Sequence, residues 1–278
     1  MKCLQVVLRI FGSKTVDYMD ALVEPLIALL KDCGSEQRVE VVNCLVVVTT
    51  SLKYLVECYA PQIAGLIQKY WDESTLISNL VLMEYFAKYL NDVAKPAIVV
   101  LMPRFMESLE EEVRRTPKNV AVLSRYIEAI EVLAPQIEEF HCLIFPLLNS
   151  LLNDSETPVE IACKYILMAG RMCASANISS SVGSIITAIL RLLGREVQSP
   201  TRILSSVVES FVLFARHSPS VFAPFVPSVF RALQKYGSKR KELNKLLALL
   251  TEFHTNGKVP SALVAPELDS YNQTFEMG

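Results

Sequence analysis

The segment SPTRILSSVVESFVLFARH, residues 199–217, carries the pattern that decides the fold. Within it Ile203, Val207, Phe211 and Phe214 recur at intervals of three or four residues, the spacing of one face of an α-helix. A second apolar stripe runs directly beside the first, and serine and glutamate side chains lie opposite both. The segment therefore predicts an amphipathic helix whose wide apolar face needs other helices to cover it.

A Ser or Thr residue precedes a new apolar helical pattern six times along the chain, at intervals of 39 to 42 residues. These markers are Ser35, Ser74, Thr116, Thr157, Ser199 and Ser238. Their hydroxyl groups can accept a hydrogen bond from the open amides of a first helical turn, and proline, which follows three of them, suits the first helical position. We therefore predict that the markers are helix N-caps, with Thr157 and Glu160 forming a capping box.

A second marker repeats with the same period of about 40 residues. Prolines occupy equivalent places in four apolar segments, and Leu66 and Ala188 hold that place in two others. The prolines are Pro25, Pro103, Pro146 and Pro227. Two independent markers with one period indicate a repeated unit of two helices.

The two markers together predict a series of helices joined by short connections. The expected helices are 2–11, 17–31, 36–52, 57–71, 75–90, 96–113, 117–133, 137–152, 158–174, 180–194, 200–215, 220–236 and 239–254.

A single pair of such helices cannot bury its apolar face, whereas stacked pairs can. We therefore predict an all-α fold, an α-solenoid of HEAT-type antiparallel helix pairs with about six repeats and a partial one. The solenoid is expected over 1–254 and an extended tail over 255–278. Because the first helix is apolar and lacks a full preceding pair, we expect a fragment of a longer array.

The composition of the chain disfavours several classes of protein. The formal net charge of −2 argues against a sleeve for nucleic acid, which is normally basic. No apolar run reaches the roughly 18 residues that a membrane-spanning helix needs. The seven cysteines have no paired spacing and are expected to be reduced core residues of a cytosolic or nuclear protein.

Residues with catalytic or ligand-binding spacing are absent from the sequence. His141, His217 and His254 are far apart, and neither a glycine-rich phosphate loop nor a nucleophile motif occurs. The acidic runs 110–112 and 138–139 are expected to be solvated helix edges. We therefore predict no catalytic, cofactor-binding or metal-binding residues, and a helical hydrolase is the least favoured alternative.

One basic cluster is a candidate partner-binding site. It consists of Lys235, Lys239, Arg240, Lys241 and Lys245. Cations near a helix C-terminus are favourable and promote solubility, which explains the cluster without a ligand. The alternative is a dock for an acidic partner, or for nucleic acid, which the absence of interleaved aromatic residues makes less favoured. A partner contact is likewise an alternative for the connection EEEVRRTPK (110–118).

Six stretches, in their order along the chain, resemble the HEAT-repeat region of the target of rapamycin (TOR) Ser/Thr kinases. They are QVVLRIFG (5–12), DYMDALVEPLIALL (17–30), CYAPQIAGLIQKYW (58–71), VVLMPRFMESL (99–109), EEFHCLIFPLLNSLLND (138–154) and SVFAPFVPSVFRAL (220–233). Trp71, which closes one helix, is a further point of resemblance, whereas 110–118 and 195–200 depart from the family.

The resemblance implies a non-catalytic middle segment of a large kinase whose catalytic domain lies outside these residues. Such a segment supports complex assembly in growth and nutrient signalling and docks accessory subunits, such as a Raptor-like adaptor or a second TOR copy. It implies a cytoplasmic protein that reaches endomembrane surfaces through the full-length complex. The alternative is a stand-alone HEAT scaffold of the karyopherin (nuclear transport) or phosphatase-scaffold type, because those proteins have similar patterns.

Overall fold

A computed structural model describes residues 3, 6, 7, 10, 18–195, 200–234 and 236, and every structural statement below refers to these residues. Its contacts divide the chain into two compact units, Met1–Phe140 and His141–Gly278. Each unit is described by itself. The described secondary structure is helical, which confirms the predicted all-α class.

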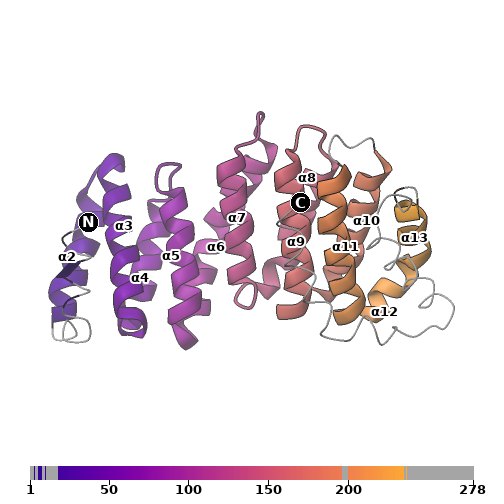
Figure 1. Ribbon diagram of the computed structural model, residues 1–278. Helices are drawn as coiled ribbons and strands as arrows, with labels where there is room; N and C mark the ends of the chain where they lie inside the picture. Colours follow the sequence, from indigo (N-terminus) through magenta and orange to yellow (C-terminus); the bar gives the residue numbers. More distant parts are fainter. Residues whose placement is uncertain are drawn as a thin grey trace. The chain divides into compact units, whose positions relative to one another are not determined.

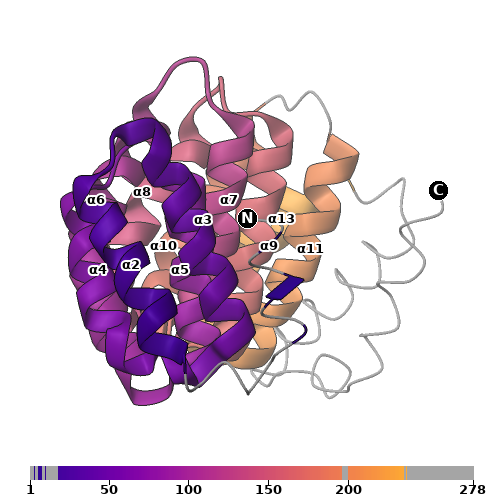
Figure 2. The same cartoon turned by 90° about the vertical axis from the view of Figure 1, so that its left-hand side faces the viewer.

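The first unit contains helices in two layers (Figure 1). Its elements are α2 (Met19–Asp32), α3 (Ser35–Leu52), η2 (Lys53–Tyr59), α4 (Ala60–Lys69), α5 (Leu76–Tyr89), α6 (Asn91–Arg114), α7 (Val120–Leu133) and η3 (Glu138–Phe140). Helices α2, α4 and α6 pack in one layer, and α3, α5 and α7 pack in the other (Figure 2). Alternate helices of the chain are therefore neighbours in space, which is the arrangement of an α-solenoid.

Polar contacts between neighbouring repeats of the first unit have the predicted period. Arg115 forms an ion pair with Glu73, 42 residues earlier, with Nη2 and Oε1 3.0 Å apart. The hydroxyl of Tyr70 donates to the carbonyl oxygen of Lys31, 39 residues earlier. Equivalent positions of successive repeats therefore lie side by side.

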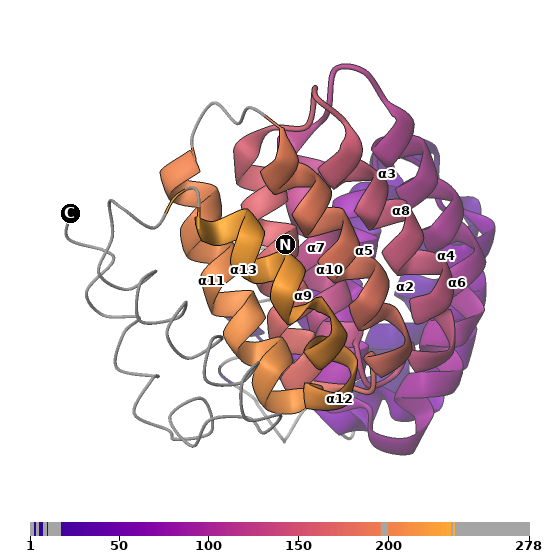
Figure 3. The same ribbon diagram turned by 90° about the vertical axis from the view of Figure 1, so that its right-hand side faces the viewer.

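The second unit repeats the two-layer arrangement. Its elements are α8 (His141–Asn153), α9 (Val159–Ser175), α10 (Ser179–Gly194), α11 (Pro200–His217), α12 (Pro219–Phe222), η4 (Ala223–Phe225) and α13 (Val226–Gln234). Helix α9 packs on α11 and α8 packs on α10. Helices α12 and α13 cover the exposed side of α10, as Figure 3 shows. The antiparallel helix pairs predicted from the sequence are thus confirmed in both units.

Helices α9 and α11 of the second unit approach each other closely at a glycine. A Cβ atom added to Gly170, in the middle of α9, would lie 2.9 Å from the Cα atom of Ser210 on α11. The Ser210 hydroxyl donates a buried hydrogen bond of 2.7 Å to the Ile166 carbonyl oxygen, 44 residues earlier. Here a missing side chain lets the two helices meet at backbone distance.

The proline markers keep their predicted places, because Pro25, Pro103 and Pro146 lie inside α2, α6 and α8. The predicted capping role of the Ser/Thr markers is wrong where the structure describes it. Ser35 is the first residue of α3 rather than its cap, and the hydroxyl of Thr157 has no hydrogen-bond partner among the described residues.

Other residues occupy the cap positions. Thr75 rather than Ser74 precedes α5, and Asn119 rather than Thr116 caps α7 by accepting a hydrogen bond from the Val122 amide at 3.3 Å. The cap positions of α3, α5, α7 and α9 therefore lie one to three residues from the Ser/Thr markers. Ser199 and Ser238 lie outside the described residues, as does the predicted tail 255–278.

The prediction that the cysteines belong to the core is wrong for most of them. Cys163 and Cys173 are buried. Cys3, Cys58 and Cys142 are exposed, and the remaining two are half-buried. Apolar neighbours in the sequence do not place a cysteine on the buried stripe of its helix, because the stripe covers only part of the circumference.

Candidate functional site

The basic cluster singled out from the sequence lies outside the described residues. Lys235, Lys239, Arg240, Lys241 and Lys245 all belong to this part of the chain. Their role as a partner-binding site therefore stays a prediction. The structure instead directs attention to a pocket in the first unit that the sequence did not single out.

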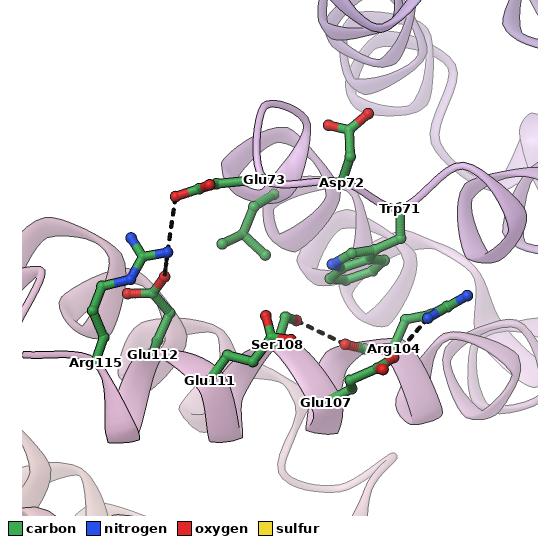
Figure 4. Close-up of a pocket in the computed structure, with 10 residues that line it drawn as sticks. Trp71, Asp72, Glu73, Arg104, Glu107, Ser108, Glu111, Glu112 and Arg115 are labelled. Atoms are coloured by element: carbon green, nitrogen blue, oxygen red, sulfur yellow. Dashed lines mark hydrogen bonds and ion pairs between the residues drawn. The ribbon is translucent and has the colours of Figure 1, made fainter.

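This pocket lies between α6 and the connection from α4 to α5 (Figure 4). Its cavity volume is about 190 Å³. Trp71, Leu76 and Ser108 contribute to the lining, and the remaining lining residues are charged. We call it the Trp71 pocket.

The helical spacing of α6 explains why its polar residues share one wall. Positions 104, 107, 108, 111, 112 and 115 recur every three or four residues and so lie on one face. Ser108 is fixed there by two hydrogen bonds. Its hydroxyl donates to the Arg104 carbonyl oxygen at 2.7 Å and accepts from the Tyr126 hydroxyl of α7 at 2.6 Å.

The opposite wall is held by a hydrogen-bonded turn. One carboxylate oxygen of Asp72 accepts from the Thr75 amide at 3.0 Å and from the Ser74 hydroxyl at 2.5 Å. Local bonds of this kind stabilise a turn at the start of a helix. The turn places Trp71 and Glu73 on either side of Asp72, facing α6 (Figure 4).

Two arginines at the rim are already paired. Arg104 Nη1 lies 2.6 Å from Glu107 Oε2. Arg115 pairs with both Glu73 and Glu112, and its Nη2 atom lies 3.2 Å from Glu112 Oε1. The Glu73–Arg115 contact links the two walls (Figure 4). The Arg104–Glu107 and Arg115–Glu73 pairs are exposed, and exposed ion pairs add little stability.

Glu112 differs from its neighbours in the acidic run. Its side chain is almost fully buried, with 3% of the residue exposed, so the expectation of a solvated edge is wrong at this position. Burial raises the pKa of its carboxyl group, Arg115 opposes that shift, and Glu73 and Glu111 add to it. Its Oε2 atom is buried and has no hydrogen-bond partner among the described residues.

Trp71 supplies the second unused polar group. Its indole Nε1 atom is buried and lacks an acceptor within the described part of the chain. An indole N–H is only a donor, so the group needs an acceptor such as a carbonyl oxygen. Trp71 is also the single tryptophan of the protein.

The charges of the pocket are unbalanced. Five carboxyl groups, those of Asp72, Glu73, Glu107, Glu111 and Glu112, line it together with two guanidinium groups. No salt bridge of Glu111 occurs among the described residues, and its side chain is exposed. The Trp71 pocket is therefore an acidic recess with a free acceptor, a free donor and an aromatic ring.

Sequence reasoning missed this site, although a signal was present. The charged and hydroxyl residues from 104 to 115 fall on one helical face, and Trp71 lies in the connection that follows α4, the preceding helix of the same layer. The sequence did not indicate that Trp71 meets the 104–115 segment, because the two are more than 30 residues apart. The predicted connection 110–118 is also shorter than expected, since α6 continues to Arg114.

Another polar cluster, in the second unit, is part of the core. The hydroxyl of Tyr165 donates to Asn149 Oδ1 at 2.7 Å, and Asn149 Nδ2 donates to the Ser184 hydroxyl at 3.3 Å. Burial raises the pKa of Tyr165 well above its ordinary value. These bonds pair polar groups where α8, α9 and α10 meet, with Tyr165 and Asn149 buried and Ser184 exposed.

Within the described ranges, no three His, Cys, Asp or Glu side chains are grouped so that they could hold a metal ion. None of the helices searched there is both long and apolar enough to cross a membrane.

No protein-family profile matches the chain. The chain is 20% identical to the Serine/threonine-protein kinase TOR2 of Saccharomyces cerevisiae over 234 residues, which cover 83% of this chain and 9% of that protein. It is also 20% identical to the Serine/threonine-protein kinase mTor of Drosophila melanogaster over 246 residues, covering 88% and 10%. The chain thus spans about a tenth of the length of these relatives.

Solved structures with a similar fold are helical repeat proteins. A designed armadillo repeat protein has a TM-score of 0.57 at 13% identity, covering 83% of this chain and 98% of that chain. A second designed armadillo repeat protein, in complex with peptide (KR)4, has a TM-score of 0.56 at 14% identity with the same coverage. These likenesses show the fold, and the sequence matches confirm the predicted resemblance: over most of its length this chain is a helical-repeat array similar to a segment of the TOR kinases.

Proposed function

We propose that this chain is a non-catalytic protein-interaction scaffold, a HEAT segment of a TOR-like kinase that supports complex assembly. The observation that carries this proposal is the coincidence of two findings over the same residues. Similarity to two TOR kinases extends over 83% and 88% of the chain, and the described residues form helical repeats. Helical repeats present extended surfaces that bind other proteins.

The absence of activity in this segment is part of the proposal. The matched region is about a tenth of each relative, which leaves room elsewhere for a kinase domain. In the second unit, the polar side chains of Tyr165, Asn149 and Ser184 are hydrogen-bonded to one another. Binding of other proteins suits this arrangement better than catalysis.

The partners that we propose are a Raptor-like adaptor, other TOR complex subunits or a second TOR copy, in growth and nutrient signalling in the cytoplasm. A structural neighbour in complex with peptide (KR)4 supports peptide binding as a use of this fold. The basic cluster from Lys235 to Lys245 is proposed as an additional dock for an acidic partner.

A pull-down from native lysate tests the scaffold function, with the whole chain as bait and mass spectrometry as the readout. We expect to recover a Raptor-like adaptor or the TOR kinase itself. Charge reversal of Lys239, Arg240 and Lys241 should reduce that recovery if the basic cluster takes part, and reversal of the exposed cations Lys31, Lys69 and Arg191 is the matched control. Recovery of Ran with nuclear cargo, or of a phosphatase catalytic subunit, would overturn the proposal in favour of a stand-alone scaffold.

A further inference from the structure

Resting on the scaffold function above, we propose that the Trp71 pocket binds an arginine side chain from an extended segment of a partner protein. Three independent features of the pocket favour this ligand: its charge, its unused hydrogen-bonding atoms and its aromatic wall.

Charge comes first. Five carboxyl groups and two guanidinium groups line the pocket, so a cation is attracted and an anion is repelled. Both guanidinium groups already pair with carboxylates, Arg104 with Glu107 and Arg115 with Glu73 and Glu112. Their positive charge is therefore partly neutralised, which disfavours a phosphate or carboxylate ligand in a pocket with more carboxylates than cations.

The unused atoms specify a ligand with several donors and one acceptor. Glu112 Oε2 is buried without a donor among the described residues, although a buried carboxylate oxygen is costly to leave unmatched. The neighbouring Glu111 carboxylate has no ion pair among the described residues. A guanidinium group has five N–H donors in a planar fork and can satisfy two acceptors at once.

The aromatic wall distinguishes arginine from a metal ion or a simple ammonium group. The ring of Trp71 lines the pocket opposite the carboxylates of α6 (Figure 4). Guanidinium groups stack on indole rings and are weakly hydrated, so they enter half-buried sites at a lower cost than ammonium groups. The buried Nε1–H of Trp71 additionally needs an acceptor, and the backbone carbonyl oxygen of an extended segment supplies one.

The single tryptophan makes this testable by intrinsic fluorescence of the whole chain. The probe is a capped octapeptide of alternating arginine and serine, which has no aromatic residue. Titration should change the Trp71 emission in a saturable way. Peptides with lysine or glutamate in place of arginine should bind at least several-fold more weakly or not at all.

The pocket variant is the double substitution Glu111→Gln and Glu112→Gln. We expect it to raise the dissociation constant by roughly tenfold or more, because it removes the unmatched acceptors that favour a cation. The matched control is Glu36→Gln with Glu138→Gln, which removes the same charge at exposed positions outside the pocket. The control should change the dissociation constant less than about twofold at physiological salt.

Equal weakening by the pocket variant and the control would mean that only net charge attracts the peptide, and would overturn the arginine site. An absent or unsaturable fluorescence change, or equal affinity for the lysine peptide, would overturn it as well. Failure of the arginine site and failure of the scaffold function can be told apart, because the two are measured in different experiments. Peptide binding is measured on the purified chain, whereas the scaffold function is measured by which proteins the lysate yields.

Discussion

Replacement of two glycines by alanine should have opposite effects on the stability of the second unit. Gly170 and Gly183 both lie inside helices, α9 and α10. In a helix interior, glycine is less favourable than alanine by roughly 0.5–1 kcal/mol, so each substitution starts with a gain of that size. The atoms around the added methyl group then decide whether the free energy of unfolding rises or falls.

At Gly170 the added Cβ would lie 2.9 Å from the Ser210 Cα atom, a backbone atom that cannot rotate away. Separating α9 from α11 would also stretch the buried Ser210–Ile166 hydrogen bond of 2.7 Å. Overpacking costs roughly 1–3 kcal/mol and the hydrogen bond contributes about 1 kcal/mol, so Gly170→Ala should destabilise the unit by about 1–3 kcal/mol.

At Gly183 the nearest atom is Phe225 Cζ at 3.5 Å, an ordinary van der Waals contact. Gly183→Ala should therefore keep the propensity gain and raise the free energy of unfolding by up to about 1 kcal/mol. Urea denaturation followed by circular dichroism measures both variants under the same conditions. If Gly170→Ala were as stable as Gly183→Ala, the backbone-distance contact between α9 and α11 would be wrong.

Three further predictions concern charged and reactive side chains. Arg125→Met should lower the free energy of unfolding by roughly 2–4 kcal/mol in a denaturation experiment, because it leaves the buried Glu84 carboxylate without its ion-pair partner. Burial raises the Glu112 pKa above its ordinary value of 4.5, so the folded state holds this proton more tightly than the unfolded chain and the resulting stability is lost as pH rises through the folded pKa. Glu112→Gln should therefore remove a fall in stability that begins as pH rises above about 4.5, and an unchanged profile would contradict this assignment. Burial likewise raises the thiol pKa of Cys163, so iodoacetamide should modify the exposed Cys58 first and Cys163 only after unfolding, as peptide mass spectrometry can determine.

The helices were predictable because their signal is local. Apolar residues at intervals of three or four positions predict α11 over 200–215, and the structure has Pro200–His217. Less regular segments were predicted less well. The single helix expected over 220–236 is divided into α12, η4 and α13. Periodicity indicates where a helix forms but does not resolve a change in its winding, which depends on packing against α10 and α11.

The capping residues were mispredicted for a related reason. Thr116 and Asn119 are both good N-cap residues, and the sequence alone offers no basis for choosing between them. The structure selects Asn119, so α7 begins three residues later than predicted, at Val120. The cost of moving a helix start by one turn is small compared with the apolar burial that positions the whole helix.

By itself, the sequence determined that this protein is a repeated array of amphipathic helix pairs with a period of about 40 residues, because helix periodicity and repeat spacing are properties of the linear chain. Only the tertiary structure decided which of the adjacent glutamates is buried and that Trp71 lines the same pocket. Glu111 and Glu112 have the same chemistry and differ by one position, but a step of one residue turns a side chain about 100° around α6. That rotation places Glu112 against the preceding repeat and leaves Glu111 exposed, because the face that meets a neighbour depends on contacts between residues far apart in the chain.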